Sequence, residues 1–226
     1  YIYMVYRKKA GKRRKPRKTR RYPRYSNVST KTPFPRTFKT NFKMVDQFSL
    51  IPAIPNYLDY SIYRATSLYQ PQIGVSHQPR YFDQVMPMYD HYVVLGAKIT
   101  IEALNASSTI PAILCVSLFD DGSALTSIND YMENKHARWK TVPTSDAGKS
   151  TFLSCTYSPK FLGKNNPIND DELKGTATTN PGENAYFHIV TAPMDGTSVG
   201  GTLNLIVTTQ LHVAFIEPKD VAASTI

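Results

Sequence analysis

The sequence predicts an all-β fold: an eight-stranded antiparallel jelly-roll sandwich with long loops and a basic N-terminal arm. Three observations predict it. Apolar and polar residues alternate with a period of two in several stretches, which is the pattern of a half-buried strand. Sixteen prolines and eleven glycines interrupt the chain often, and this disfavours long helices. Strand-like stretches do not alternate with helical ones, so two packed antiparallel sheets are the economical way to bury their one-sided faces.

The first clear strand is expected over residues 38–50. Its even positions are apolar, as at Phe38 and Phe42, whereas its odd positions are mostly polar. Residues 110–119 are apolar on both faces, so we expect this strand in the centre of a sheet. Five further stretches have strand character, namely residues 92–104, 136–142, 150–157, 185–192 and 203–215. With these seven stretches, we expect about eight strands in all. Their long and uneven connections favour a jelly roll over an immunoglobulin sandwich.

The strand at 92–104 has one apolar and one polar face. Lys98 and Glu102 belong to the polar face, and the apolar face is expected to consist of Val93, Leu95, Ala97, Ile99 and Ile101. Two long stretches, residues 70–88 and 159–184, carry several prolines and glycines and are expected to be loops.

Two short helices are expected between the strands. In residues 56–69, Leu58, Ile62 and Ala65 fall near one face at helical spacing. Residues 125–134 form the second expected helix.

Charge divides the chain into an arm and linker, residues 1–36, and a body, residues 37–226. The first 45 residues carry 16 of the 27 Lys and Arg residues and no acid, because the first acidic residue is Asp46. The remaining residues carry 11 basic and 17 acidic side chains, a net charge of −6. Like charges at the density of the arm repel one another and bury nothing, so the arm cannot fold alone.

A nucleic acid is the natural partner of such an arm. Phosphates attract Lys and Arg without regard to base sequence, and Arg can bind a phosphate in a bidentate manner. Tyrosines that interleave with the arginines offer faces on which unpaired bases can stack. The residues expected to bind nucleic acid are Arg7, Lys8, Lys9, Lys12, Arg13, Arg14, Lys15, Arg17, Lys18, Arg20, Arg21, Tyr22, Arg24 and Tyr25.

Two other interpretations of the arm stay open. A solvated tail that aids solubility is the simpler one, although such a tail is more usually acidic or of mixed charge. Nuclear import is the other, and it is compatible with nucleic-acid binding. The cluster that suits the acidic groove of an import receptor is Lys12, Arg13, Arg14, Lys15, Arg17 and Lys18.

No motif predicts catalysis, and we expect no enzyme activity, no cofactor and no bound metal. Residues 148–151, GKST, match the end of a phosphate-binding loop, but Pro143 stands where its first glycine belongs. The segment that follows has strand character, whereas such a loop opens a helix. The five histidines lack metal-ligand spacing, and neither cysteine has a C-x-x-C partner. Trp139 is expected to be a packed or interface aromatic.

The remaining features favour an ordinary interior and no membrane insertion. Cys115 and Cys155 lie in apolar, strand-like runs and are expected to be buried free thiols. The acids at 120–121 and 170–172 can hold a cation in principle, but loop acids that face water are the simpler expectation. No stretch of 18 apolar residues exists, so no membrane span is expected.

The overall layout is an acid-free Arg/Lys-rich arm, a linker and one eight-stranded body. Local similarity lies in residues 78–83 (QPRYFD), 89–102 (YDHYVVLGAKITIE) and 158–163 (SPKFLG). In these features the chain resembles capsid proteins of small circular, Rep-encoding single-stranded DNA viruses, the circovirus-like group. A plant satellite-virus or other RNA-virus coat protein would look similar.

The resemblance implies a jelly-roll subunit that self-assembles into a T=1 icosahedral shell of about 60 copies. It implies an arm directed inward onto a single-stranded genome, which we expect to be DNA, and location in the virion and in the host nucleus during assembly. The implied partners are identical subunits, the genome, a nuclear import receptor and a cell-surface receptor. A cellular nucleic-acid-binding protein with a basic tail is the alternative, but its body would normally be basic too.

Overall fold

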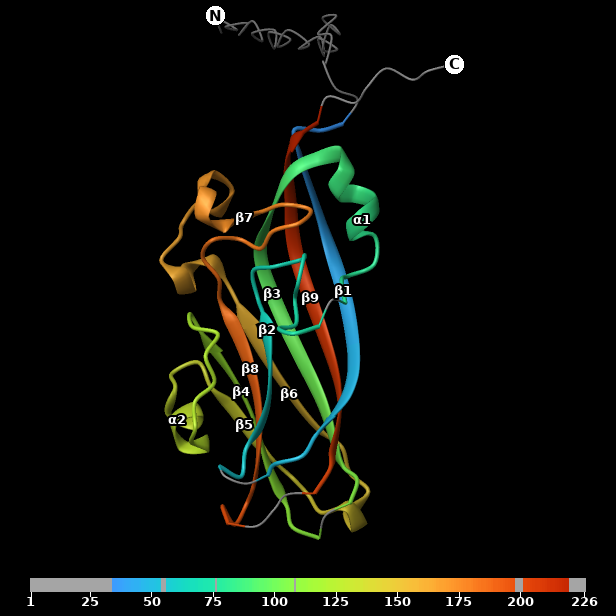
Figure 1. Cartoon of the computed structure of the whole chain (residues 1–226), viewed down its shortest axis with the longest axis vertical. Helices are drawn as coiled ribbons and strands as arrows, with labels where there is room; N and C mark the ends of the chain where they lie inside the picture. The colour runs from blue at the N-terminus through green and yellow to red at the C-terminus, as the bar shows by residue number, and fades with distance from the viewer. Residues whose placement is uncertain (1–33, 54–55, 76, 108, 198–200, 220–226) are drawn as a thin grey trace, which may run out of the picture. The chain divides into compact units, whose positions relative to one another are not determined.

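A computed structural model describes residues 34–53, 56–75, 77–107, 109–197 and 201–219. These residues form two antiparallel sheets that face each other across a shared core (Figure 1). One sheet, termed the long sheet, has the order β1 (Thr37–Leu50), β9 (Leu203–Pro218), β3 (Tyr89–Asn105) and β6 (Thr151–Tyr157), with β7 (Lys174–Gly175) also paired to β3. The other, termed the short sheet, has the order β2 (Asp59–Arg64), β8 (Tyr186–Pro193), β4 (Ala112–Phe119) and β5 (Arg138–Val142).

The order in which strands pair is that of a jelly roll. With the two-residue β7 left aside, the first strand pairs with the last, β1 with β9, and the second with the last but one, β2 with β8. The remaining strands, which lie between these in the sequence, follow the same rule: β3 pairs with β6, and β4 pairs with β5. Successive pairs therefore alternate between the two sheets, as when one long antiparallel hairpin is rolled up. The predicted eight-stranded antiparallel jelly roll is confirmed.

Strand alternation decides which side chains fill the space between the sheets. In β1, Phe42 and Met44 are buried while Lys43 between them is exposed. In β9, Leu205 and Val207 are buried in the same alternating way. Side chains from both sheets form one continuous apolar cluster. Each large apolar side chain removed from water contributes about 1.5–3 kcal/mol, so this cluster is the main source of stability.

A bulge in β3 changes which face its side chains take. The register of β3 against β9 shifts between Val94 and Gly96, so Leu95 is an extra residue. Val94 and Ala97, on either side of the bulge, both face the main core. Val93 and Leu95 lie in a separate cluster on the opposite face. The expectation that Val93 and Leu95 share a face with Ala97 was therefore wrong, because strict alternation does not allow for an inserted residue.

The helix expected over residues 56–69 was also wrong, because this segment contains β2. All six residues of β2 pair in register with β8, and Ile62 and Tyr63 are both buried. Pairing along the edge of the short sheet thus overrides a helical spacing that is only weakly marked. The second expected helix is confirmed as α2 (Ile128–Glu133), whose Ser127 side chain accepts a hydrogen bond from the Asn129 amide.

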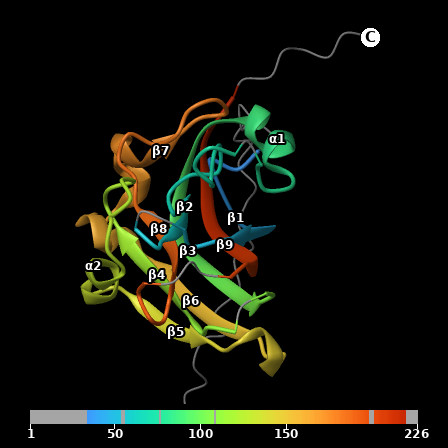
Figure 2. The ribbon, with the colours of Figure 1, turned by 60° about the horizontal axis from the view of Figure 1, so that its bottom comes forward.

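The two expected loops contain short helical turns. The first holds α1 (Phe82–Val85) and the 3-10 turn η1 (Met86–Met88), which bury Phe82 and Met86. The second holds β7 and three 3-10 turns, namely η3 (Pro159–Leu162), η4 (Pro167–Asn169) and η5 (Asp171–Leu173). Across the short sheet, α2 packs on β4 and β8 on the side away from the main core (Figure 2).

Both cysteines are free and buried, as expected. Burial raises the pKa of the Cys115 thiol to about 12 and also raises the pKa of Cys155. Within the part of the chain that is described, no helix is long and apolar enough to cross a membrane.

Candidate nucleic-acid interface

The residues predicted to bind nucleic acid, from Arg7 to Tyr25, lie outside the residues that the structure describes. The import cluster from Lys12 to Lys18 lies outside them as well. Their roles stay predictions. The described residues begin at Phe34, three residues before β1. They therefore include the end of the long sheet at which β1 begins, and the outer face of that sheet.

Aromatic side chains fix the point at which the chain enters the long sheet. The ring of Phe38 stacks on Tyr89 with 6.4 Å between centroids, and on Phe215 with 6.3 Å. The Tyr89 hydroxyl donates a hydrogen bond of 3.2 Å to the carbonyl oxygen of Pro35. Aromatic pairs add about 0.5–1.5 kcal/mol beyond the area that they bury. The chain on either side of Arg36 is therefore held firmly against the sheet.

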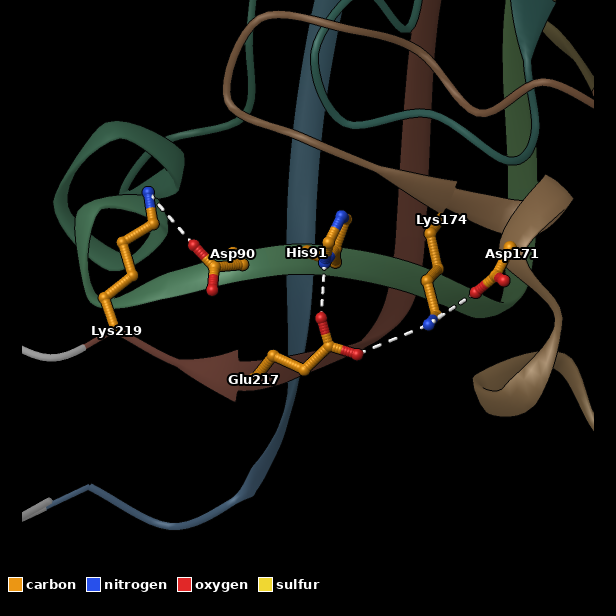
Figure 3. A network of polar contacts seen from close by, with 6 residues as sticks. All are labelled: Asp90, His91, Asp171, Lys174, Glu217 and Lys219. Atoms are coloured by element: carbon orange, nitrogen blue, oxygen red, sulfur yellow. Dashed lines mark hydrogen bonds and ion pairs between the residues drawn. The ribbon is translucent and has the colours of Figure 1, made fainter. Parts of the chain in front are cut away.

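A network of ion pairs holds the last residues of β9 at the same end of the sheet. Glu217 accepts from His91 Nδ1 at 2.7 Å and from Lys174 Nζ at 3.3 Å, and Lys174 also pairs with Asp171 at 2.7 Å. The backbone of Glu217 has a φ of 60°, a left-handed conformation that costs a non-glycine residue about 1–2 kcal/mol. His91, and then Lys174, hold the pKa of Glu217 below its usual value. Figure 3 shows the network, which consists of Asp90, His91, Asp171, Lys174, Glu217 and Lys219.

The outer face of the long sheet carries a row of polar side chains that crosses all four strands. Lys43 of β1 lies opposite Gln210 of β9, Gln210 lies opposite Lys98 of β3, and Lys98 lies opposite Thr156 of β6. All four side chains are exposed. Two lysines separated by 55 positions in the sequence are thus brought to one face by strand register alone.

A hollow of about 500 Å³ lies over this row and the next one. In the next row, His212 Nδ1 lies 2.7 Å from Asn41 Oδ1, and Gly96 at the bulge adds no side chain. The polar part of the hollow's lining includes Lys43 and Lys98, and apolar side chains such as Phe42 and Leu211 contribute as well.

A second hollow of about 300 Å³ lies further across the same face, at the β6 edge. Thr100 and Ser154 come from the long sheet, two residues along from the row just described. Arg138 and Lys140 reach it from β5, the neighbouring edge strand of the short sheet. Phe152, a residue that is 53 % exposed, also lines this hollow.

Positive charge on this face is not neutralised locally. Among the described residues, Lys43 and Lys98 form no ion pair, whereas Lys164 pairs with three carboxylates and Lys174 with two. Glu102 is the one acid that points outward in the described central part of these strands, which comprises residues 39–49, 96–104, 152–156 and 204–212. A body with more acids than bases therefore has a locally basic face.

The acids at 170–172 were expected to face water, and two of them do. Asp171 and Glu172 are exposed, and they pair with Lys174 and Lys164 respectively. Lys164 Nζ lies 2.8 Å from Glu172, 2.9 Å from Glu183 and 3.0 Å from an Asp170 oxygen. These carboxylates raise the pKa of Lys164, so the loop acids serve to hold the 159–184 segment together.

The GKST segment does not form a phosphate-binding loop. The 3-10 turn η2 (Ser145–Ala147) ends at Gly148, and β6 rather than a helix begins at Thr151. In the ranges that the structure describes, no group of three or more His, Cys, Asp or Glu side chains could hold a metal ion. Trp139 is 53 % exposed, which favours the interface over the packed interpretation of this residue.

Comparison with known proteins gives similarities to viral structures. A scan against protein-family models finds no match, and no curated protein matches the sequence. A structure of Cocksfoot mottle virus has a TM-score of 0.47 and 12% identity, over 81% of this chain and 97% of that chain. The decameric BFDV capsid protein has a TM-score of 0.45 and 12% identity, over 80% and 100%. The T=3 Penaeus vannamei nodavirus has a TM-score of 0.44 and 9% identity, over 95% and 65%. Because these identities are low, the jelly-roll assignment rests on the strand pairing described above.

Proposed function

We propose that this chain is a viral capsid protein with a structural rather than an enzymatic role. Its body assembles with identical subunits into a T=1 icosahedral shell, and its arm packages a single-stranded DNA genome. The observation that supports this best is the division of charge. Sixteen basic residues and no acid precede Asp46, and the jelly roll that follows is mildly acidic. A polyanion is the partner that such an arm requires, while a body without excess positive charge can pack closely against copies of itself.

Exposed aromatic side chains on the body favour contacts between subunits. Tyr60 and Trp139 lie in one row across the outer face of the short sheet, at its two edge strands, with Val190 and Cys115 between them. Tyr60 is 48 % exposed and Trp139 is 53 % exposed. Large aromatic side chains of this kind are typical anchors of protein interfaces.

The charge of the acid-free segment before Asp46, which comprises the arm and the first part of β1, also fits a genome of defined size. The smallest icosahedral shell repeats one subunit about 60 times. With 16 basic residues per subunit before Asp46, about 10³ positive charges line the interior. Since each nucleotide carries one negative charge, they match a strand of about 10³ nucleotides.

Nuclear delivery completes the proposal. The cluster at residues 12–18 carries six basic residues within seven positions. Clusters of this density suit the acidic groove of an import receptor. We infer that the same arm that binds the genome brings the newly made protein to the nucleus, where assembly takes place.

The test is nuclease protection with the full chain. Full-length protein expressed in cells is purified after nuclease treatment, and the protected nucleic acid is measured for the natural chain and for an arm variant in which the six basic residues of 12–18 are changed to Gln. We expect protected single-stranded nucleic acid with the natural chain and a large loss with the variant. A control variant with exposed body lysines changed, Lys135→Gln, Lys149→Gln and Lys160→Gln, should protect as much as the natural chain. Equal protection by the arm variant would contradict the proposal.

A further inference from the structure

The basic outer face of the long sheet suggests a second contact with nucleic acid, on the body rather than on the arm. We propose that Lys43, Lys98, Arg138 and Lys140 bind phosphates of a single strand that crosses this face, and that Phe152 stacks on one of its bases. These five residues are termed the basic sheet face. The proposal rests on the proposed function, since its ligand is the packaged strand, and it adds a site that the basic arm does not supply.

The shape of this face fits an extended polymer. The hollow of about 500 Å³ spans β1, β9, β3 and β6, and the hollow of about 300 Å³ lies next to it over β3 and β6 and extends to β5. Neighbouring strands are about 4.8 Å apart, so the four strands span about 14 Å. That width suits a short run of nucleotides rather than a single small anion.

The charges on this face are available to a ligand. Within the described chain, Lys43 and Lys98 have no carboxylate partner, although other lysines of the same body have two or three. Gln210, Asn41 and Thr156 lie between and beside them and offer neutral hydrogen-bonding groups. Cations that attract phosphates, next to amides and hydroxyls that hydrogen-bond to phosphate or sugar, are the usual components of a backbone contact.

An aromatic platform distinguishes this face from a merely basic patch. Phe152 lines the same hollow as Arg138 and Lys140, and this residue is more than half exposed. A cationic groove with an exposed aromatic ring is the arrangement that binds single strands without sequence preference. A single strand is therefore favoured over a duplex, whose bases are already stacked.

The sequence links this face to the arm. Lys39 and Lys43 are the last two basic residues of the acid-free segment, and they point outward from β1. In the sequence, these two lysines are therefore the basic residues of the sheet that follow the arm most closely, and Lys98 lies across the sheet from Lys43 with Gln210 between them.

The test uses the full chain with its arm intact. Affinity for a single-stranded dT oligonucleotide is measured across a salt series for the natural chain and for the triple variant Lys43→Gln, Lys98→Gln and Lys140→Gln. Each lysine that no longer neutralises a phosphate should reduce the steepness of log K against log salt by about 0.7, so the triple variant should differ by about 2. The matched control changes three exposed lysines that lie off this face, Lys135→Gln, Lys149→Gln and Lys160→Gln, and should keep the natural slope.

A second measurement follows individual lysines. Amine labelling of the natural chain, analysed by mass spectrometry, should show Lys43 and Lys98 protected when the oligonucleotide is bound and Lys135 unprotected. The variant Phe152→Leu should bind more weakly with an unchanged salt slope, since it removes stacking but no charge. A second triple variant, in which Lys43, Lys98 and Lys140 are changed to Arg, keeps the charge and should keep the natural slope. If it does, the weaker salt dependence of the Gln triple variant reflects lost charge rather than misfolding.

The proposal is overturned if the Gln triple variant keeps the slope of its control and Lys43 is labelled equally with and without the oligonucleotide. That result leaves the proposed function intact, provided that the arm variant of residues 12–18 still loses binding. If the arm variant binds as well as the natural chain, it is the proposed function that fails.

Discussion

Replacing Gly175 by alanine should destabilise the body by driving a methyl group into a buried tyrosine. A Cβ atom built at Gly175 would overlap Tyr92 Cζ and lie 2.5 Å from its hydroxyl oxygen. Tyr92 is fully buried, and its hydroxyl lies 3.0 Å from Ser67 Oγ and 3.3 Å from the amides of Leu68 and Tyr69. The ring therefore cannot swing aside without breaking these hydrogen bonds.

The magnitude follows from these two costs. Overpacking of a buried site costs about 1–3 kcal/mol, and loss of a buried hydrogen bond costs about 1–3 kcal/mol more. We expect Gly175→Ala to lower the free energy of unfolding by about 2–6 kcal/mol. For a chain of this size, that corresponds to a fall in Tm of about 4–24 °C.

Thermal or denaturant unfolding of the full chain measures this cost. A double-mutant cycle with Tyr92→Leu shows whether the cost arises from the overlap between the new methyl group and the Tyr92 ring. Tyr92→Leu removes the ring atoms that meet the new methyl group, so Gly175→Ala should cost under about 1 kcal/mol in that background. Gly182→Ala is the control, because a Cβ there would meet only backbone atoms of Glu172, with the carbonyl oxygen nearest at 3.6 Å. If Gly175→Ala costs the same with and without the Tyr92 ring, the close packing of β7 on β3 is not the cause.

Three further predictions concern the described end of the sheet, the thiols and the arm. Glu217→Gln should lower stability by a few tenths of a kcal/mol at pH 7, because its carboxylate is half exposed and its ion pairs are partly screened. Since His91 and Lys174 depress the pKa of Glu217, this stability is present above the unfolded-state pKa and is lost as the pH falls, so variant and natural chain should unfold alike in acid. Both cysteines should resist a thiol reagent in the native protein at pH 8 and react on unfolding, because they are buried and their pKa values are raised; fast native labelling would contradict the packing. A fluorescent protein fused to the arm should enter nuclei, and changing residues 12–15 to Ala should prevent this; unchanged accumulation would move the import signal elsewhere.

Local periodicity carried most of the fold prediction. Residues 38–50 and 203–215 alternate over many positions, and they form β1 and β9, which pair with each other along the whole length of β1. In β2 the prediction failed because six residues with two adjacent buried side chains carry little periodic signal, and pairing with β8 determines their structure. The bulge at Leu95 escaped prediction for a related reason, since an inserted residue is recognised only by its unpaired position opposite β9.

Of the candidate nucleic-acid interface, too, one part was predicted from the sequence and another was not. The basic arm is evident from composition, because its function depends on charge density rather than on a fold. The basic sheet face was not predicted, although Lys43 and Lys98 were both recognised as outward-facing strand residues. They become neighbours only through Gln210, which pairs with both, and this register is set by the whole of β9. A sequence signal existed in the polar faces of three strands, but the order of those strands in the sheet was needed to combine them.

Electron microscopy of the purified full-length protein tests the capsid proposal most directly. Assembly into a T=1 shell predicts closed particles of one size, with about 60 subunits each and with single-stranded nucleic acid inside. Image reconstruction should then place the basic sheet face and the first residue of β1, Thr37, toward the interior. A protein that stays monomeric at every concentration and salt condition, or particles with Thr37 on their outer surface, would contradict it.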